Sequence, residues 1–327
     1  MELEFNKIKK LLFLRYDGKI GDYIITSWIY REIKKQRPDI QIDVVGISKN
    51  EKLFLNNKSI NKFYKLKKSK KLFMYFLAKK LRVEDYDVLI DPTEVLRNRD
   101  LFFIKNINAK INFGYDKGNV NLFSKSINKN SKTMVDVYKE ILENLGFCNL
   151  DSNYEVPIKV SSEKKIDEYL KSNRIDKYIA MNFFGTGKRR KFTPKKATEL
   201  IVKVRNEYPE HEIIILNSPR DKKVIFKIIK RIKCLDSNSN IFYGEDFKTI
   251  YDAISLINKS DIVITPDTAV VHIAKGLKKN IVAFYSENKE NYEKWGLSID
   301  EKKNRIYFYN ENINNLNINK MDSFLEN

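Results

Sequence analysis

The sequence predicts an α/β protein built from two Rossmann-like domains with parallel sheets, and three observations support this. The chain of 327 residues exceeds the size at which a single hydrophobic core usually stops growing. In both halves, short apolar runs alternate with segments of helical periodicity, which is typical of βαβ units. A polar stretch interrupted by proline, 149–162, separates the two series and indicates a domain boundary. Such sheets bind ligands at the carboxyl ends of their strands, so we expect both sheets to face a central cleft.

The first half opens with a buried strand over 9–16, a glycine turn, a helix over 23–37 that stops at Pro38, and a strand over 40–47. This order predicts a right-handed βαβ unit. The elements that follow are expected to be a basic helix, two strands and a closing helix, at 67–82, 86–91, 108–116 and 134–147. We assign residues 1–155 to this N-terminal domain.

The second half repeats the alternation, and we assign residues 156–310 to a C-terminal domain. Its apolar runs predict strands at 178–183, 211–217, 240–244, 261–267 and 280–286. Helices are expected to begin near Pro194, Asp221, Phe247 and Val270. The tail 311–327 is expected to form a C-terminal helix, with packing back toward the N-terminal domain as one arrangement.

The net charge of +19 and the pI near 9.5 predict attraction to a polyanion, whether nucleic acid, an anionic membrane or a phosphorylated lipid. The many Lys, Asn and Ile residues also fit an AT-rich genome. With only Cys148 and Cys234 and no CxxC pair, neither a disulfide framework nor a structural zinc site is indicated. The sequence offers no apolar run long enough to cross a bilayer and no signal-like start, which predicts a cytoplasmic protein.

The first segment with chemical potential is Arg15 to Thr26, where Gly18 and Gly21 permit a tight turn from strand to helix. Asp22 falls at the start of that helix. One role for it is simple helix capping. The other is general-base catalysis, in which Asp22 takes a proton from a substrate hydroxyl so that the hydroxyl oxygen can act as a nucleophile.

The second segment, Asn182 to Pro194, follows a strand with two glycines, four consecutive cations and a proline at a helix start. Backbone N–H groups, a helix N-terminus and cations suit a diphosphate whose negative charge grows as it departs. The segment is not a Walker A loop, because GxxxxGK[ST] is absent. The alternative is a solvated basic loop.

The third segment, Asp261 to Leu277, is an apolar strand that ends at Asp267 and Thr268, followed by a helix that carries His272. Asp267 or Thr268 can cap this helix, or Thr268 and the free N–H groups can grip a phosphate while Asp267 fixes the loop or a ribose hydroxyl. A lone helical histidine is more often structural than catalytic.

The stretch Asn61 to Arg82 mixes basic and aromatic residues. It fits a core helix with a solvated basic face, a helix that lies on a membrane surface, or both at once. Metal chemistry has little support, because the sequence lacks HExxH, a close cluster of His and carboxylates, and a DxD motif before a strand end. GxSxG is also absent, and GxxG in place of GxGxxG argues against a dehydrogenase.

In this order the segments resemble glycosyltransferase family 9, the ADP-heptose:lipopolysaccharide heptosyltransferases, over nearly the whole chain. The matching stretches are GKIGDYIIT, YDVLIDPTEVLRN, INFGYD, KRRKFTPKKATEL and DTAVVHIAKGL. The resemblance implies a GT-B architecture, with the acceptor on the N-terminal domain and the nucleotide sugar on the C-terminal domain. It also implies inverting, metal-independent transfer without a cofactor.

Carried over by position, the resemblance makes Asp22 the catalytic base. The residues it assigns to the donor are Thr186, Gly187, Lys188, Arg190, Lys191, Asp221, Asp267, Thr268, Ala269 and His272. Those it assigns to the acceptor are Arg15, Gly18, Lys19, Gly21 and Arg97.

The chain departs from the family pattern at three positions. Phe192 replaces a Trp, Ala269 replaces a Gly, and Arg190 stands where the family has Lys. A donor other than ADP-heptose therefore stays open, as does a glycan acceptor other than lipopolysaccharide.

The expected partners are a nucleotide sugar, an anionic lipid-linked oligosaccharide acceptor and the cytoplasmic face of the inner membrane, with no specific nucleic acid. Two other hypotheses are a non-catalytic polyanion-binding protein and a catalytically silent family member that serves as a scaffold.

Overall fold

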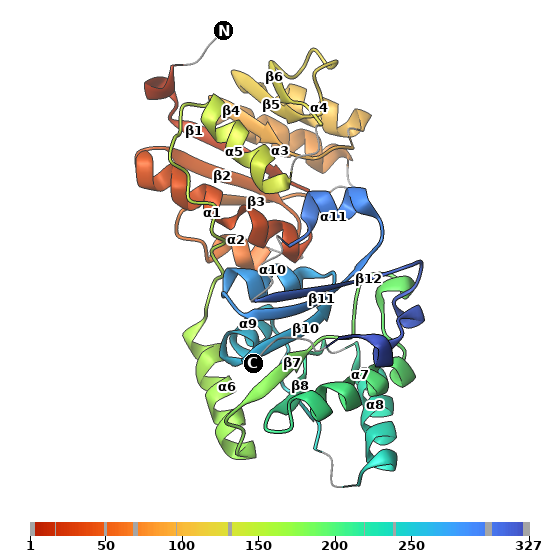
Figure 1. Ribbon diagram of the computed structural model, residues 1–327. Coiled ribbons are helices and arrows are strands. Elements are labelled where there is room, and N and C mark those ends of the chain that lie inside the picture. Colours follow the sequence, from red (N-terminus) through yellow and green to blue (C-terminus); the bar gives the residue numbers. More distant parts are fainter. Residues whose placement is uncertain are drawn as a thin grey trace. The chain divides into compact units, whose positions relative to one another are not determined.

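The computed structural model describes residues 4–16, 18–48, 51–67, 71–95, 97–129, 133–218, 220–237, 240–297 and 303–322. The chain divides into two compact units, Met1–Glu155 and Val156–Asn327. Each has the α/β character that the sequence predicts, with helices packed on a parallel sheet (Figure 1).

Within its described residues, the first unit holds a six-stranded sheet in the order β3-β2-β1-β4-β5-β6. Its strands, all parallel, are β1 (Lys10–Arg15), β2 (Gln41–Gly46), β3 (Lys62–Lys65), β4 (Val88–Asp91), β5 (Ile111–Tyr115) and β6 (Lys125–Ile127). Its α-helices are α1 (Ile20–Gln36), α2 (Glu51–Leu55), α3 (Lys71–Val83), α4 (Asn98–Ile107) and α5 (Met134–Asn144), after a 3-10 turn at Phe5–Lys7. The central strands are buried on both faces, as the continuous apolar runs predict.

Within its described residues, the second unit holds a sheet in the order β12-β11-β10-β7-β8-β9. Its strands, again parallel, are β7 (Tyr178–Met181), β8 (Glu212–Ile215), β9 (Phe242–Tyr243), β10 (Ile262–Pro266), β11 (Asn280–Ser286) and β12 (Asn304–Tyr309). Its α-helices are α6 (Val160–Asn173), α7 (Pro194–Glu207), α8 (Lys222–Leu235), α9 (Ile250–Lys259), α10 (Ala269–Gly276) and α11 (Lys289–Trp295). Short 3-10 turns lie at Lys188–Arg190, Ile313–Asn315 and Ile318–Lys320.

The strand order creates a topological switch point in each sheet. In the first unit the chain leaves β1 for β2 and β3, then returns to β4 on the other side of β1. In the second it leaves β7 for β8 and β9, then returns to β10 on the other side of β7. Successive connections diverge at these two places, and open parallel sheets generally bind ligands at such points, beside the carboxyl ends of the strands. The β1/β4 and β7/β10 edges are therefore where ligands are expected.

Two local predictions are wrong. The basic and aromatic stretch 61–82 is not helical throughout, because its residues 62–65 form the edge strand β3. They can do so because β2 offers a free edge, to which β3 adds in parallel register. The helix predicted at 67–82 corresponds to α3. Residues 68–70 of that stretch lie outside the described residues.

The tail is the second correction, because its described part, up to residue 322, contains short 3-10 turns and no α-helix. Asn312 accepts a hydrogen bond from the backbone N–H of Asn314, and such side-chain bonds compete with helix formation. Ile313 and Ile318 are buried in the core of the second unit. The end of the tail, 323–327, lies outside the described residues.

Candidate functional site

Asp22 lies in the first turn of α1, just after the carboxyl end of β1 at the switch point of the first sheet. Gly18 has φ +64°, a left-handed conformation that favours glycine and allows the chain to turn from β1 into α1. Lys19 occupies the N-cap position and Asp22 is the third helical residue, so Asp22 is not the N-cap of α1. A carboxylate here is stabilised by the positive end of the helix dipole. Asp22 is also partly exposed, so a ligand can reach it.

The other side of this switch point carries a buried ion pair. Lys117 Nζ lies 2.9 Å from Asp91 Oδ2 at the end of β4, and the two side chains are 1% and 0% exposed. The same ammonium donates to the carbonyl oxygens of Asp91 and Thr93. Thr93 in turn donates its N–H and its hydroxyl to Asp91 Oδ1. The network therefore fixes the loop that follows β4.

The remaining residues assigned to the acceptor differ in accessibility. Arg15, the last residue of β1, is buried and donates a hydrogen bond to the Tyr138 hydroxyl of α5. Gly21 is buried within α1, whereas Lys19 is exposed. Arg97 is exposed at the N-cap of α4. Lys19 and Arg97 are therefore open to a ligand, whereas Arg15 connects β1 to α5.

The second switch point is lined by a cluster of hydroxyl and amide groups. Asn182 follows β7, and its amide nitrogen donates to Thr265 Oγ1 at 3.0 Å and to Thr268 Oγ1 at 3.2 Å. Thr265 lies in β10, and its hydroxyl is 3.2 Å from that of Thr268. Thr268 is the N-cap of α10 and accepts from the N–H of Val270. The carboxyl ends of β7 and β10 are thus joined directly beneath a helix N-terminus.

Arg190 and Asp267 meet at the same edge. Arg190 Nη1 lies 3.0 Å from Asp267 Oδ2, and the side chains are 35% and 10% exposed. Asn291 of α11 also donates to Asp267 Oδ2, at 3.3 Å. A Cβ on Gly185 would lie 2.3 Å from the carbonyl oxygen of Arg190, so only glycine lets the loop fold this closely. The ion pair places a cation beside the N-terminus of α10.

The loop around Arg190 is mostly solvent-exposed. Thr186, Gly187 and Lys188 are exposed, and Gly187 has φ +91°. Lys191 is exposed too, and its carbonyl accepts from Asn314. Phe192 turns inward and packs edge-on against core rings, including Phe284 at 5.4 Å between centroids. Phe192 therefore anchors the loop, and Arg190 is the loop cation tied to the switch point.

Three further residues assigned to the donor are Ala269, His272 and Asp221. Ala269 is the first residue of α10, and His272 lies one turn further in, 6% exposed. Burial, with a smaller effect of Lys275, lowers the pKa of His272 to about 4. His272 is therefore neutral at pH 7 and supplies no positive charge to a phosphate. Asp221, at the N-cap of α8, accepts a hydrogen bond from the Ser218 hydroxyl at 2.6 Å.

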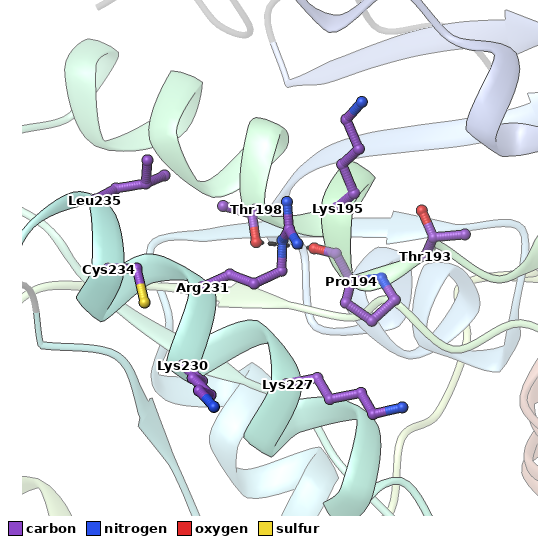
Figure 2. A pocket seen from close by; sticks show the side chains of 9 residues that line it. All are labelled: Thr193, Pro194, Lys195, Thr198, Lys227, Lys230, Arg231, Cys234 and Leu235. Atoms are coloured by element: carbon purple, nitrogen blue, oxygen red, sulfur yellow. Dashed lines mark hydrogen bonds between the residues drawn. The ribbon is translucent and has the colours of Figure 1, made fainter.

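A groove of about 640 Å³ lies between α7 and α8, and no residue assigned to donor or acceptor lines it. Figure 2 shows its lining side chains, which come from the start of α7 and from one face of α8, including Lys227, Lys230 and Arg231. The described residues contain no group of three or more His, Cys, Asp or Glu side chains that could hold a metal ion. Within the same residues, no helix is long and apolar enough to cross a membrane.

Comparison with known proteins agrees with the motifs. A family model described as "Glycosyltransferase family 9 (heptosyltransferase)" matches residues 74–322. The chain belongs to this family. The protein is therefore a glycosyltransferase, and the resemblance drawn from its motifs is confirmed.

Individual relatives support the same assignment. The chain is 25% identical over 291 residues to an Escherichia coli K12 protein provisionally named lipopolysaccharide heptosyltransferase 4, covering 86% of this chain and 76% of that one. A family 9 glycosyltransferase from Veillonella parvula has a TM-score of 0.75 at 16% identity, covering 99% and 90% of the two chains. Heptosyltransferase II of E. coli has a TM-score of 0.71 at 14% identity, with 92% and 90% covered. The α/β fold of this family 9 enzyme is of the GT-B class, as expected.

Several residues at the two edges are not predicted by the sequence motifs. Asn182 could have been found, since a polar side chain directly after a buried strand lies at the ligand-binding edge of a parallel sheet. Thr265 lies within a run with the pattern of a buried strand, so the sequence gives it no sign of a site residue. Lys117 and Asn291 gave no signal, because their partners Asp91 and Asp267 are distant in sequence.

Proposed function

We propose that this enzyme is an inverting transferase that moves heptose from ADP-heptose onto a lipopolysaccharide core acceptor. The name of the E. coli relative supports the acceptor class. The donor class is supported by E. coli heptosyltransferase WaaC, solved with ADP-2-deoxy-2-fluoro heptose, whose fold matches with a TM-score of 0.63 at 11% identity over 91% of this chain and 92% of that one.

The observation that carries the proposal is the cluster at the β7/β10 switch point. Thr268 caps α10, Asn182 holds Thr268, and Asp267 holds Arg190. The first N–H groups of a helix and a nearby guanidinium are the groups that bind a diphosphate. We assign Arg190, rather than the exposed Lys191, as the main cation on the donor. Asp267 orients it without covering all of its N–H groups, because a guanidinium carries five.

In the reaction that we propose, Asp22 acts as the base. The acceptor hydroxyl gives its proton to the Asp22 carboxylate while its oxygen forms a bond to the anomeric carbon of the donor. The bond from that carbon to the diphosphate oxygen breaks, and its electron pair leaves with the nucleoside diphosphate. One displacement inverts the configuration at the anomeric carbon. Arg190 and the N-terminus of α10 stabilise the negative charge that develops on the leaving group.

The test is a matrix of nucleotide sugars and truncated-core acceptors, with products identified by mass spectrometry and their anomeric configuration by NMR. We expect one heptose added from ADP-heptose, with inverted configuration. Transfer of a different sugar would correct the donor, and transfer to an unrelated glycan would correct the acceptor. Donor binding without transfer to any acceptor would favour the catalytically silent scaffold. Salt-sensitive binding of RNA without donor binding would favour the polyanion-binding alternative.

A further inference from the structure

We infer that the first unit binds an anionic lipid bilayer through one surface of α3 and α4. We call this surface the α3–α4 face. Its apolar members are Leu72, Tyr75, Phe76, Val83 and Phe102, and its cations are Lys71, Lys79, Lys80, Arg82 and Lys105.

Helix α3 has two apolar sides, and only one is used by the core. Four side chains, Met74, Leu77, Ala78 and Leu81, are buried against the sheet. Three others on the outer side remain in solvent, with Leu72 68%, Phe76 61% and Val83 87% exposed. At about 100° per residue, these three lie within about 40° of one another around the helix axis. They form an apolar stripe along the outer side of α3.

Helix α4 extends the stripe. It packs against α3, and Phe102, 51% exposed, stacks on Tyr75 with ring centroids 6.1 Å apart. Lys79 Nζ lies 5.5 Å from the centroid of the Tyr75 ring. Scattered exposed apolar residues need no explanation, but a contiguous group rimmed by charge marks a surface for a partner or a membrane.

The charges around the stripe identify the partner. By the same helical geometry, Lys71 and Arg82 lie on one side of it, Lys80 on the other and Lys79 within it. The sequence of α3 has no acidic residue, and the single carboxylate of α4, Asp100, is 3% exposed. Aromatic and aliphatic side chains bordered by long cations suit the interface of a bilayer, where the apolar groups enter the acyl boundary and the cations meet lipid phosphates.

Helix α8 is the competing basic surface, and its pattern differs. It carries Lys227 and Lys230, and its exposed apolar residues are Phe226 (67%) and Leu235 (69%). These two are nine residues apart and so lie on opposite sides of the helix axis. They cannot enter one bilayer surface together, which makes α8 a matched control with similar exposure and charge.

This inference extends the proposed function, because a lipid-linked acceptor would be reached from the bilayer surface. Its test needs neither donor nor acceptor. Vesicles of phosphatidylethanolamine, phosphatidylglycerol and cardiolipin are sedimented with the full chain, and phosphatidylcholine vesicles serve as the uncharged comparison. We expect binding to the anionic vesicles that weakens as salt rises, since screening acts over about 8–10 Å at ordinary ionic strength.

The variants decide which surface binds. We expect L72S/F76S to bind at least tenfold more weakly than the unaltered protein. K79Q/R82Q should bind the anionic vesicles about fivefold more weakly for each cation removed. The α8 controls, F226S/L235S and K227Q/K230Q, should bind within about twofold of the unaltered protein, and unchanged urea midpoints would verify that all four variants fold.

Equal losses in both sets of variants, a loss confined to α8, or no anionic-vesicle binding at low salt would each overturn the inference. Transfer to a soluble acceptor fragment would be unaffected by its failure, so the two proposals are separable.

Discussion

Replacing Lys117 tests the architecture of the first switch point. The Lys117–Asp91 pair is 2.9 Å long and essentially inaccessible to water, with 1% and 0% exposure. A Lys117→Met substitution leaves the Asp91 carboxylate buried without its cation and frees the two carbonyl oxygens that Lys117 holds. Breaking a buried pair in this way costs about 3–5 kcal/mol. This is a large part of the roughly 5–15 kcal/mol that stabilises a domain.

The assay is urea unfolding followed by circular dichroism, with the transition of the first unit analysed separately. Removing both charges in D91N/K117M should restore stability to within about 1–2 kcal/mol of the unaltered protein. The exposed pair Lys65–Glu51, 2.7 Å long and 43% and 29% exposed, gives the control Lys65→Met, which should cost at most about 1 kcal/mol. A cost below 1 kcal/mol for Lys117→Met, or a double variant as unstable as the sum of its parts, would refute this account of the pair.

Two further predictions concern the second unit. Burial lowers the pKa of His272 to about 4, below its ordinary value of about 6.5, so the unfolded chain binds the extra proton first as pH falls. The free energy of unfolding should fall between pH 6.5 and 4, by about 2 kcal/mol on going from pH 7.5 to 5. In urea unfolding, His272→Leu should lack this part of the pH dependence. The same pH dependence in the variant and the unaltered protein would contradict the assignment. Arg190→Met should weaken ADP-sugar binding by about 10- to 100-fold in calorimetry, because charged hydrogen bonds are lost. The adjacent Arg189→Met should bind the ADP-sugar within about twofold of the unaltered protein. Equal effects of the two substitutions would mean that only overall charge matters.

The central strands could be predicted from the sequence because burial on both faces makes them continuous apolar runs. The strands β1, β4, β10 and β11 belong to this class. The edge strands β3 and β6 each bury a single residue, and β12 is half-buried along most of its length, so none of them stands out from a loop. Their pairing depends on a neighbouring strand that supplies a free edge.

The candidate site, like the strands, could be predicted from the sequence only in part. The placement of Asp22, Asp267 and Thr268 at the sheet edges could be predicted, because each closely follows a buried strand in the sequence. The pairing of Arg190 with Asp267 spans 77 residues and was not predictable, because it depends on how two loops meet at the β7/β10 edge. The same holds for Lys117 and Asp91, which are brought together by the β4–β5 register and the turn that follows β5.

The most direct test of the proposed mechanism is the single-turnover rate of sugar transfer by Asp22→Asn under saturating donor and acceptor. The variant keeps the shape of the side chain and removes its basicity, so we predict a rate about 10²–10⁴-fold lower with donor affinity unchanged. Asp85→Asn, the same substitution at a 75%-exposed side chain of the first unit, should transfer at the normal rate. Transfer by Asp22→Asn at close to the unaltered rate would contradict the assignment of Asp22 as the base.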